Sequence, residues 1–303
     1  MLKCFASFIL CFCVHAATFA EALPTVTVAP DLKYLQRILK QKKFSAPFIK
    51  SIIKNYDADS FQTVLKYNML GFLNPPQHSV LVTEEGAAKS QEFIESNQNV
   101  FNQVAKRDHV PASVIASLLW VETKQGKLTG RYHVTSVFSD LIQVTRPEVV
   151  EQLTSLAIDA EKEKPEPKKN LKKLMRLRTK RKAAWALDEL RALEKFYKKD
   201  KKMVEELQGS FAGAFGIPQF IPSSYFTYSK PFGKRKVADL YLPADAISSV
   251  SNYLKKTGWN SKNRIKKMKA LMHYNNSEDY AESILELSEQ ILANRAKAPA
   301  GGK

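Results

Sequence analysis

Cysteine is almost absent from this sequence of 303 residues, which excludes most thiol chemistry. The three cysteines, Cys4, Cys11 and Cys13, lie in an N-terminal segment with one early lysine, a short apolar run and small residues near its end. This pattern is typical of a secretory signal peptide. We therefore predict a signal peptide over residues 1–20, followed by a mature chain without thiols or disulfides.

Long hydrophobic runs are missing as well. The N-terminal apolar run is shorter than the roughly 20 residues that a membrane-spanning helix needs, so an uncleaved anchor is the weaker alternative. Cys11 and Cys13 are candidates for lipid attachment, but neither follows the usual pattern of a leucine and small residues. We expect the mature protein in the periplasm or outside the cell.

Histidine is scarce, and the sequence offers no metal site. Of the five histidines, the four beyond the N-terminal segment lack the mutual spacing of zinc ligands. They are His78, His109, His133 and His273. We expect neither a metal ion nor another cofactor.

Acidic residues are outnumbered, since 47 lysines and arginines face 30 aspartates and glutamates. Removing residues 1–20 takes away one lysine and leaves 46 basic against 30 acidic residues, a net charge of +16. A basic exported protein favours anionic partners such as nucleic acid, acidic lipid headgroups or cell-wall polymer. Nucleic acid ranks last, because the basic stretch Lys168–Lys182 has no aromatic residues between its cations.

Alternating strand patterns of any length are absent, and apolar residues recur mainly at helical spacing, as over residues 31–70. Pro111 is placed to open a strongly apolar helix that ends near Thr123. Short β segments are expected around Val134–Phe138 and Val237–Leu242. The sequence therefore predicts a mainly α fold with small β elements.

The composition changes abruptly between about residues 160 and 202, where lysine and arginine dominate. A helical stripe of apolar residues continues in the second half of this basic insertion, at Leu187, Leu190, Leu193 and Phe196. We expect the second half of the insertion to pack against the domain and its proline-containing start to be mobile. We interpret the insertion as a solvated helical excursion from the domain rather than as an arm that binds a polymer. One domain over residues 21–295 and a flexible tail over 296–303 complete the predicted organisation.

A single acid follows the apolar run that begins at Val114. Glu122 lies four residues after Leu118 and seven after Ile115, so a helix places it on their apolar stripe. Desolvation there would raise the pKa of the carboxyl group and keep a proton available, as in the general acid of a glycosidase. A capped glutamate at a helix end is the structural alternative, and spacing alone does not separate the two.

Charged residues are also missing from Gly209–Tyr225, which is rich in glycine, proline and small polar residues. Glycines let the backbone approach a ligand closely or adopt positive φ, while prolines stiffen the path between them. We interpret this segment as the wall of a binding site rather than as a linker.

Four segments in order resemble motifs of one enzyme family. They are Val110–Gly126, Gly209–Tyr225, Pro243–Trp259 and Tyr274–Tyr280. The family is the lytic murein transglycosylases of the membrane-bound B type, also described as transglycosylase SLT domain 2. The resemblance covers roughly residues 100–285 and implies a lysozyme-like fold.

This resemblance implies non-hydrolytic cleavage of the β-1,4 bond between N-acetylmuramic acid and N-acetylglucosamine in peptidoglycan, which leaves 1,6-anhydromuramic ends. Glu122 would act first as the acid and then as the base toward the sugar's own primary hydroxyl. No second carboxylate stands in the matched segments. The acetamido group of the substrate would take the place of a protein nucleophile.

Six substrate-binding residues follow from the resemblance. They are Ser210 and Asn275 for the acetamido group, Gln219 and Phe220 for the saccharide cleft, and Tyr274 and Tyr280 for stacking on sugars. Without the resemblance, a helix cap would explain the serine, and core packing would explain the three aromatic residues.

Two departures from the family pattern bear on ligands. Family members with a calcium loop place an acid-rich segment where this chain has Lys230–Asp239, so we predict no bound calcium. A Pro-Arg-Arg segment is replaced by Gln143–Pro147, in which Arg146 is a partial substitute.

A hydrolytic muramidase and a non-catalytic peptidoglycan-binding protein stay open as alternatives. We expect a monomer that binds glycan strands and contacts the wall or membrane surface by charge.

Overall fold

The computed structural model describes residues 23–162, 164 and 169–297. The predicted signal peptide lies outside these residues, and so does most of the predicted tail. The last helix runs to Lys297, so residues 296 and 297 are helical rather than part of a tail. Within the described ranges, no helix is both long and apolar enough to cross a membrane.

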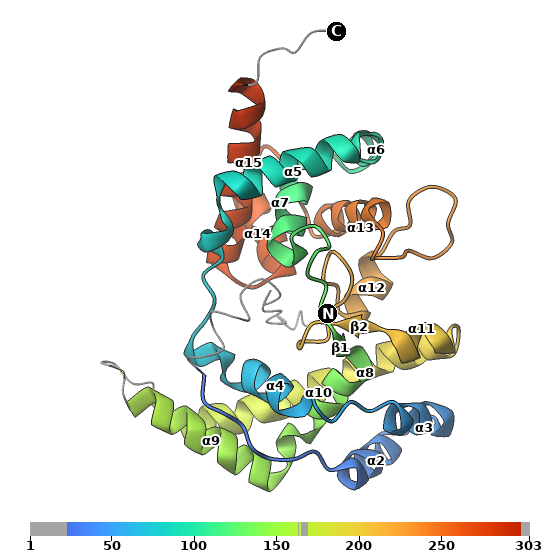
Figure 1. Cartoon of the computed structure of the whole chain (residues 1–303), viewed down its shortest axis with the longest axis vertical. Coiled ribbons are helices and arrows are strands. Elements are labelled where there is room, and N and C mark those ends of the chain that lie inside the picture. Colours follow the sequence, from blue (N-terminus) through green and yellow to red (C-terminus); the bar gives the residue numbers. More distant parts are fainter. Residues whose placement is uncertain (1–22, 163, 165–168, 298–303) are drawn as a thin grey trace.

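Helices dominate the structure, which confirms the mainly α prediction, and Figure 1 shows them in two groups. The upper group consists of α5 (Glu84–Ser96), α6 (Gln98–Asp108), α7 (Ala112–Thr123), α13 (Pro243–Lys256), α14 (Arg264–Tyr274) and α15 (Glu278–Lys297). The lower group consists of α2 (Leu32–Gln41), α3 (Ala46–Lys54), α4 (Phe61–Leu65), α8 (Val134–Ile142), α9 (Pro147–Lys162), α10 (Leu171–Tyr197) and α11 (Lys201–Glu206). The short helix α12 (Pro222–Tyr228) packs on both α10 and α13, so it connects the groups.

Irregular turns link the two groups on the N-terminal side. Helix α4 continues into the π-helical turn η1 (Lys66–Leu70) and the 3-10 turn η2 (Gly71–Leu73), and η3 (His78–Leu81) precedes α5. The 3-10 turn η4 (Gln143–Thr145) joins α8 to α9. Turns of π-helix are rare and often accompany functional sites.

Helix α7 is the centre of the upper group. It begins after Pro111, as predicted, and every residue from Ser113 to Thr123 is buried against α5, α6, α13 and α15. The helix ends where Lys124 adopts left-handed backbone angles and donates its N–H to the carbonyls of Leu119 and Trp120. An apolar helix enclosed on all sides explains why its sequence shows no polar face.

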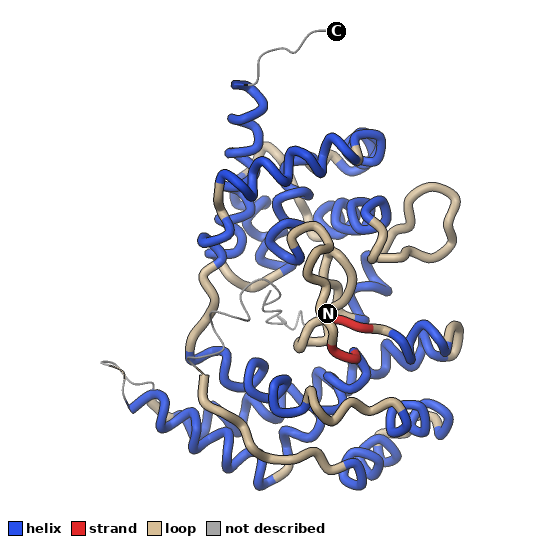
Figure 2. Tube along the Cα trace, in the orientation of Figure 1, coloured by secondary structure: helices blue, strands red, loops and turns tan. Residues whose placement is uncertain are grey.

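Both β segments were predicted in the wrong place. The strands are β1 (Tyr132–His133) and β2 (Gln208–Gly209), which pair antiparallel near the middle of the molecule, as Figure 2 shows. Val134–Phe138 instead forms the start of α8, because burial of every residue of that helix overrides the β preference of its valines and threonine. Two-residue strands are too short to leave an alternating pattern in the sequence.

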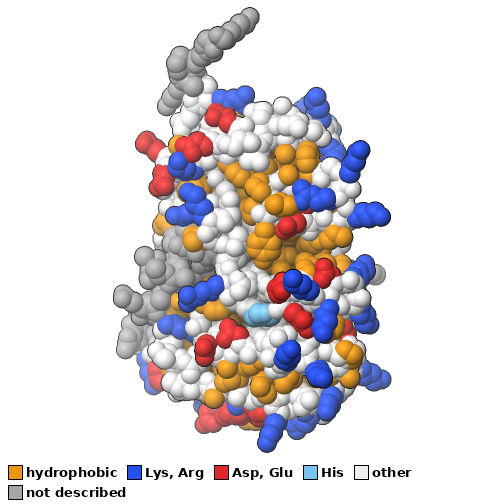
Figure 3. All heavy atoms as spheres, turned by 45° about the vertical axis from the view of Figure 1, so that its right-hand side comes forward, with side chains coloured by type: hydrophobic (Ala, Val, Ile, Leu, Met, Phe, Trp, Pro, Cys, Tyr) orange, Lys and Arg blue, Asp and Glu red, His pale blue; other side chains and the backbone are white. Residues whose placement is uncertain are grey.

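The segment Val237–Leu242 is a loop. Its backbone is held by a carboxylate rather than by a neighbouring strand, since Asp245 accepts the N–H groups of Phe232 and Asp239 at 2.8 and 2.7 Å. Figure 3 shows that apolar side chains gather in the middle of the face that carries this loop and α12. Phe226, Val237, Tyr241 and Leu242 are exposed in this part of the chain.

Helix α10 corrects the expectation of a solvated excursion. Its second half packs as predicted, and Leu190 and Leu193 are fully buried. Its basic first half is buried on one side too, through Leu171 and Met175 against α9 and the core. One apolar or small residue every four positions was enough to bury this side, and the many cations concealed that pattern in the sequence.

Candidate active site

Glu122 lies in the last turn of α7 and is 1% exposed. Its Oε1 accepts a hydrogen bond of 2.5 Å from the Tyr280 hydroxyl, which comes from the first turns of α15. The structure therefore joins the predicted acid to one of the predicted cleft tyrosines across 158 positions of sequence. A hydroxyl that donates to a carboxyl group fixes the orientation of that group.

The segment Gly209–Ile221, called the glycine loop below, begins at the small sheet. Strand β2 pairs Gly209 with Tyr132 and so places the loop beside the chain that leaves α7. Gly213 and Gly216 have φ of 78° and 73°, values that favour glycine. A Cβ atom at Gly213 would lie 2.4 Å from the Phe138 ring, so the loop needs glycine there for space as well.

Thr123 fastens the glycine loop to α7. Its hydroxyl donates to the carbonyl of Ile217 at 2.8 Å and accepts the N–H of Gly126 at 2.9 Å. The Ile217 N–H in turn donates to the carbonyl of Leu240 at 2.8 Å. The residue next to the candidate acid thus holds the loop in register with the acid.

Gln219 has positive φ, 50°, in the middle of the glycine loop. Its amide donates to the carbonyls of Gly216 at 2.9 Å and Thr129 at 3.1 Å. The side chain therefore shapes the loop and ties it to the chain between α7 and β1.

The aromatic residues predicted for the cleft form a stacked cluster. The rings of Tyr274 and Tyr280 are nearly parallel, with centroids 6.4 Å apart, and the Tyr274 hydroxyl donates to the carbonyl of Pro218. Phe220 is 1% exposed and packs against Tyr253 and Tyr274. The structure places Phe220 in the layer behind the loop, where the core interpretation would have it.

Ser210 and Asn275 are both buried, and no described contact joins them to each other or to Glu122. The Ser210 N–H and hydroxyl donate to the carbonyl of Ala214, at 2.8 and 3.4 Å, which closes the start of the glycine loop. Asn275 follows α14, and its Nδ2 has no hydrogen-bond partner in the described part of the chain. A buried amide without a partner is costly, so it is suited to a ligand that accepts a hydrogen bond.

His78 contacts the candidate site, although no local pattern in the sequence marks it. Its ring meets the Tyr280 ring edge-on at 5.3 Å, and Asp279 accepts a hydrogen bond from its backbone N–H at 2.5 Å and pairs with Nδ1 at 2.9 Å. Burial lowers the pKa of His78, and Asp279 partly opposes this effect. His78 lies before the four motif segments, which begin at Val110, so no motif pointed to it.

Asn68, in the π-helical turn η1, was missed for the same reason. Its Nδ2 donates to the carbonyl of Phe211 at 2.8 Å and to that of Val64 at 2.9 Å. Its own backbone carbonyl accepts a hydrogen bond from the Arg178 guanidinium of α10 at 2.6 Å. Asn68 therefore connects the glycine loop to the lower helix group.

Arg146 does not replace the missing arginine segment. Its guanidinium donates to the carbonyl of Ala29 at 2.8 Å and pairs with Glu148 at 2.6 Å. These contacts hold the chain before α2, at Ala29, against the start of α9. The expected partial substitution is therefore wrong, because the charged group is already used in the fold.

The residues present do not fit a calcium ion in the loop before α13. The Asp245 carboxylate accepts two backbone N–H groups and lies 3.7 Å from the Arg235 guanidinium. Calcium needs six or more oxygen ligands, whereas this loop supplies lysine and arginine side chains. Within the described ranges, no three His, Cys, Asp or Glu side chains are grouped to hold a metal.

Comparisons with known proteins identify the family and the fold. A family model described as Transglycosylase SLT domain matches residues 27–268. The chain is 25% identical over 238 residues to the membrane-bound lytic murein transglycosylase B of Escherichia coli (strain K12), an alignment that covers 76% of this chain and 53% of the relative. The chain thus spans about half the length of that curated relative.

Two solved structures show the fold. The Escherichia coli lytic transglycosylase Slt35, in complex with calcium, matches with a TM-score of 0.66 and 18% identity, over 89% of this chain and 95% of that chain. SltB3 from Pseudomonas aeruginosa, in complex with NAG-anhNAM-pentapeptide, matches with a TM-score of 0.60 and 15% identity, over 86% and 78%. These matches confirm the lysozyme-like fold. Since the family model spans most of the chain, the protein belongs to the Transglycosylase SLT domain family.

Proposed function

We propose that the protein is a lytic transglycosylase that cleaves the bond between N-acetylmuramic acid and N-acetylglucosamine in peptidoglycan and leaves 1,6-anhydromuramic ends. The observation that carries this proposal is the buried carboxyl group of Glu122, held by the Tyr280 hydroxyl and fastened to the glycine loop through Thr123. Family membership and the B-type relative support the same activity.

The proposed reaction uses Glu122 twice. Its carboxyl proton passes to the glycosidic oxygen as the bond to the anomeric carbon breaks, and the substrate's acetamido oxygen bonds to that carbon. The resulting carboxylate then accepts the proton of the muramyl primary hydroxyl, whose oxygen attacks the same carbon and displaces the acetamido oxygen. The anhydro ring closes and Glu122 is protonated again, so no water is consumed.

The surrounding residues have distinct proposed roles. Tyr280 orients the acid. The Asn275 amide, which lacks a protein partner among the described residues, would donate to the acetamido group. Ser210 would join it by turning its hydroxyl away from the Ala214 carbonyl. Gln219 shapes the wall through its two backbone contacts, and Tyr274 fixes that wall at Pro218. Phe220 supports the wall from behind, and we do not assign it direct contact with sugar.

A hydrolytic muramidase is the second candidate, because the same acid would serve water as the attacking group. The complex of SltB3 with NAG-anhNAM-pentapeptide, an anhydromuramyl compound, favours the non-hydrolytic reaction in the family.

The N-terminal segment and the basic charge support export and action at the wall. Because the acid, the glycine loop and Tyr280 all come from one chain, we propose a monomer.

The test is mass spectrometry of the fragments that the protein releases from purified sacculi, beside the Glu122→Gln variant. We expect anhydromuramyl ends from the wild type and no fragments from the variant. Reducing muramic ends would establish the muramidase instead. Release by neither protein, with sacculus binding intact, would establish a non-catalytic binding protein.

A further inference from the structure

The first part of α10 carries a one-sided positive charge that the proposed reaction does not use. Between residues 172 and 182 the sequence has seven lysines and arginines and no acid. Two of these cations turn inward, since Arg178 donates to the carbonyls of Asn68 and Met69, and Lys182 approaches the Asn68 side chain at 3.4 Å. Burial lowers the pKa of Lys182 to about 7. Five cations remain on the surface.

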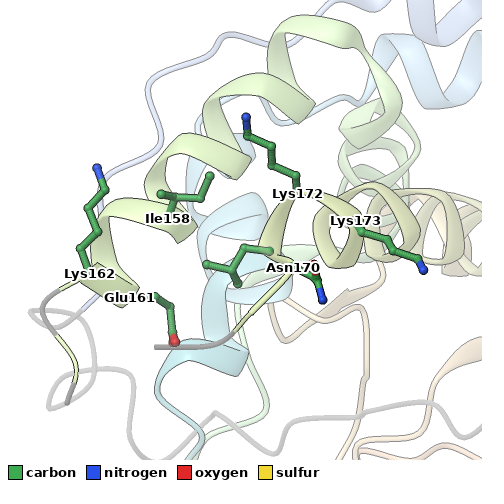
Figure 4. A pocket seen from close by; sticks show the side chains of 7 residues that line it. Ile158, Glu161, Lys162, Asn170, Lys172 and Lys173 are labelled. Atoms are coloured by element: carbon green, nitrogen blue, oxygen red, sulfur yellow. The ribbon is translucent and has the colours of Figure 1, made fainter. Parts of the chain in front are cut away.

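These five cations are exposed and carry no ion pair among the described residues, where a pair requires 4.0 Å or less. They are Lys172, Lys173, Arg176, Lys180 and Arg181. Helix α9 does not pair with them, because its Asp159 and Glu161 pair with Lys162 and Lys164. Glu151 of α9 lines the same groove as Lys172, Arg176 and Lys180 but forms no ion pair with them. Figure 4 shows Lys172 and Lys173 extending from the first turn of α10, away from Glu161.

Two leucines are exposed among these cations. Leu174 and Leu177 are 39% and 43% exposed. Residues four apart share one side of a helix at a rise of about 6 Å, so Leu177 falls between Lys173 and Arg181 in a single row. The five cations and two leucines together form one continuous surface, called the outer face of α10 below.

The outer face is held rigidly by the rest of the molecule. On the opposite side of the same turns, Leu171, Met175, Thr179 and Ala183 are buried against the core. The helix therefore does not have to order when a partner binds, which removes a large entropic cost. A disordered basic tail of the same composition would lack this advantage.

We propose that the outer face of α10 docks the protein on membranes that contain anionic phospholipid. Lysine and arginine are attracted to anionic headgroups, and leucines in the same face enter the boundary between headgroups and acyl chains. A carboxylate-rich wall polymer would satisfy the cations but offers no hydrocarbon to the leucines. The surface thus fits lipid better than polymer, and it is distinct from the site at Glu122.

Sedimentation with lipid vesicles tests this assignment. The full chain is used, so residues 1–20 contribute equally to every variant. Vesicles of phosphatidylcholine with a quarter phosphatidylglycerol are compared with pure phosphatidylcholine. The charge variant combines Lys173→Gln, Lys180→Gln and Arg181→Gln, and the apolar variant combines Leu174→Ser and Leu177→Ser. A matched control combines Lys40→Gln, Lys42→Gln and Lys50→Gln, three exposed lysines of α2, its end and α3.

We expect the charge variant to bind anionic vesicles ~100-fold more weakly, at roughly fivefold per cation. The apolar variant should lose about fivefold, and the control should keep its affinity within about twofold. Equal losses in the control and the charge variant would overturn the proposal, since net charge alone would then explain binding. Equal binding of the wild type to neutral vesicles would also overturn it.

The alternative partner has its own result. If the charge variant binds vesicles normally but loses binding to purified sacculi, the outer face recognises wall polymer and the lipid assignment is wrong. Neither readout depends on catalysis, so a failure of the proposed reaction would leave both measurements interpretable. Release of fragments from soluble glycan should be unchanged in the charge variant, because its residues are not part of the site.

Discussion

The site at Glu122 and the outer face of α10 use polar residues in opposite ways. Around Glu122 the polar groups are buried, few, and bound to the backbone or to one another, as in the contacts of Thr123 and Gln219. On α10 the polar groups are charged, numerous and open to solvent. The hydrogen bonds around Glu122 fix the positions of the side chains that would act on a substrate. The exposed cations of α10 attract an anionic partner without fixing its position. Reaction and attachment are therefore expected to fail independently.

The largest expected effect is the loss of the acid itself. Glu122→Gln should lower the rate of fragment release by about 10²–10⁴-fold, because the amide cannot donate or accept the proton in turn. Thermal unfolding and vesicle binding should stay close to those of the wild type. A variant that releases fragments at a rate near that of the wild type would show that the acid lies elsewhere.

A smaller loss of activity is expected when the Glu122 carboxyl group is kept but the hydrogen bond that orients it is removed. Tyr280→Phe removes the hydroxyl that donates to Glu122, a hydrogen bond of the kind worth about 1.5–3 kcal/mol, so kcat should fall roughly 10- to 100-fold with little change in KM. The control is the same tyrosine-to-phenylalanine substitution at Tyr274, whose ring stacks on that of Tyr280. Tyr274→Phe loses a bond to the Pro218 carbonyl, so it should change stability more than kcat. Equal kcat losses in both variants would contradict the assigned role.

The pH dependence of stability should reveal a buried acid in α10. Burial raises the pKa of Glu189 to about 7, although Ser223 partly opposes this by donating to both carboxyl oxygens. The folded protein therefore holds a proton that the unfolded chain releases above its ordinary pKa of 4.5. The stability from this group is present below pH 4.5 and is lost as the pH rises to about 7, on the order of 3 kcal/mol.

Urea unfolding at pH 5 and pH 8 measures this contribution. The difference between the two free energies should largely disappear in Glu189→Gln and shrink only slightly in Asp188→Asn, because the Asp188 carboxylate is a lesser cause of the raised pKa than burial. Because Ser223 is in the first turn of α12, directly after the glycine loop, the same experiment reports how firmly that loop is held at its far end. An unchanged difference in Glu189→Gln would assign the pH dependence to other groups.

The smallest expected effect concerns calcium. Since Asp245 is already bound by two N–H groups and approached by Arg235, adding calcium or a chelator should move the melting temperature by less than about 1 °C. Differential scanning fluorimetry is sufficient for this measurement. A rise of several degrees with calcium would mean that the loop rearranges to bind it.

Much of the fold could be predicted from the sequence because its signals are local. The apolar run after Pro111 defines α7, and the glycines and prolines of the loop mark irregular backbone. The strands could not be found, since two residues carry no periodic pattern. The buried side of α10 was underestimated, because cations outnumber the apolar residues that pack.

Some residues of the candidate site could be predicted from the sequence, and others could not. Glu122 could be placed on a buried stripe by counting residues, and the resemblance supplied Tyr280. His78 and Asn68 could not be found, because each acts through contacts with residues more than 140 positions away. The sequence gives no local indication of such a contact. Phe220 is the opposite case, since a motif residue predicted to line the cleft is fully buried and packs against Tyr253 and Tyr274, so its contact with sugar stays a prediction.

The packing of Gly213 against Phe138 has a consequence for how the motif would change during evolution. The constraint on this glycine comes from a ring in the lower helix group, 2.4 Å from where a side chain would begin, and not from any step of the reaction. A descendant that had lost its catalytic carboxylate would still be selected to keep the glycine, because its fold would fail without it. Retention of the glycine loop therefore reflects common architecture, and by itself it would not distinguish an active lineage from an inactive one.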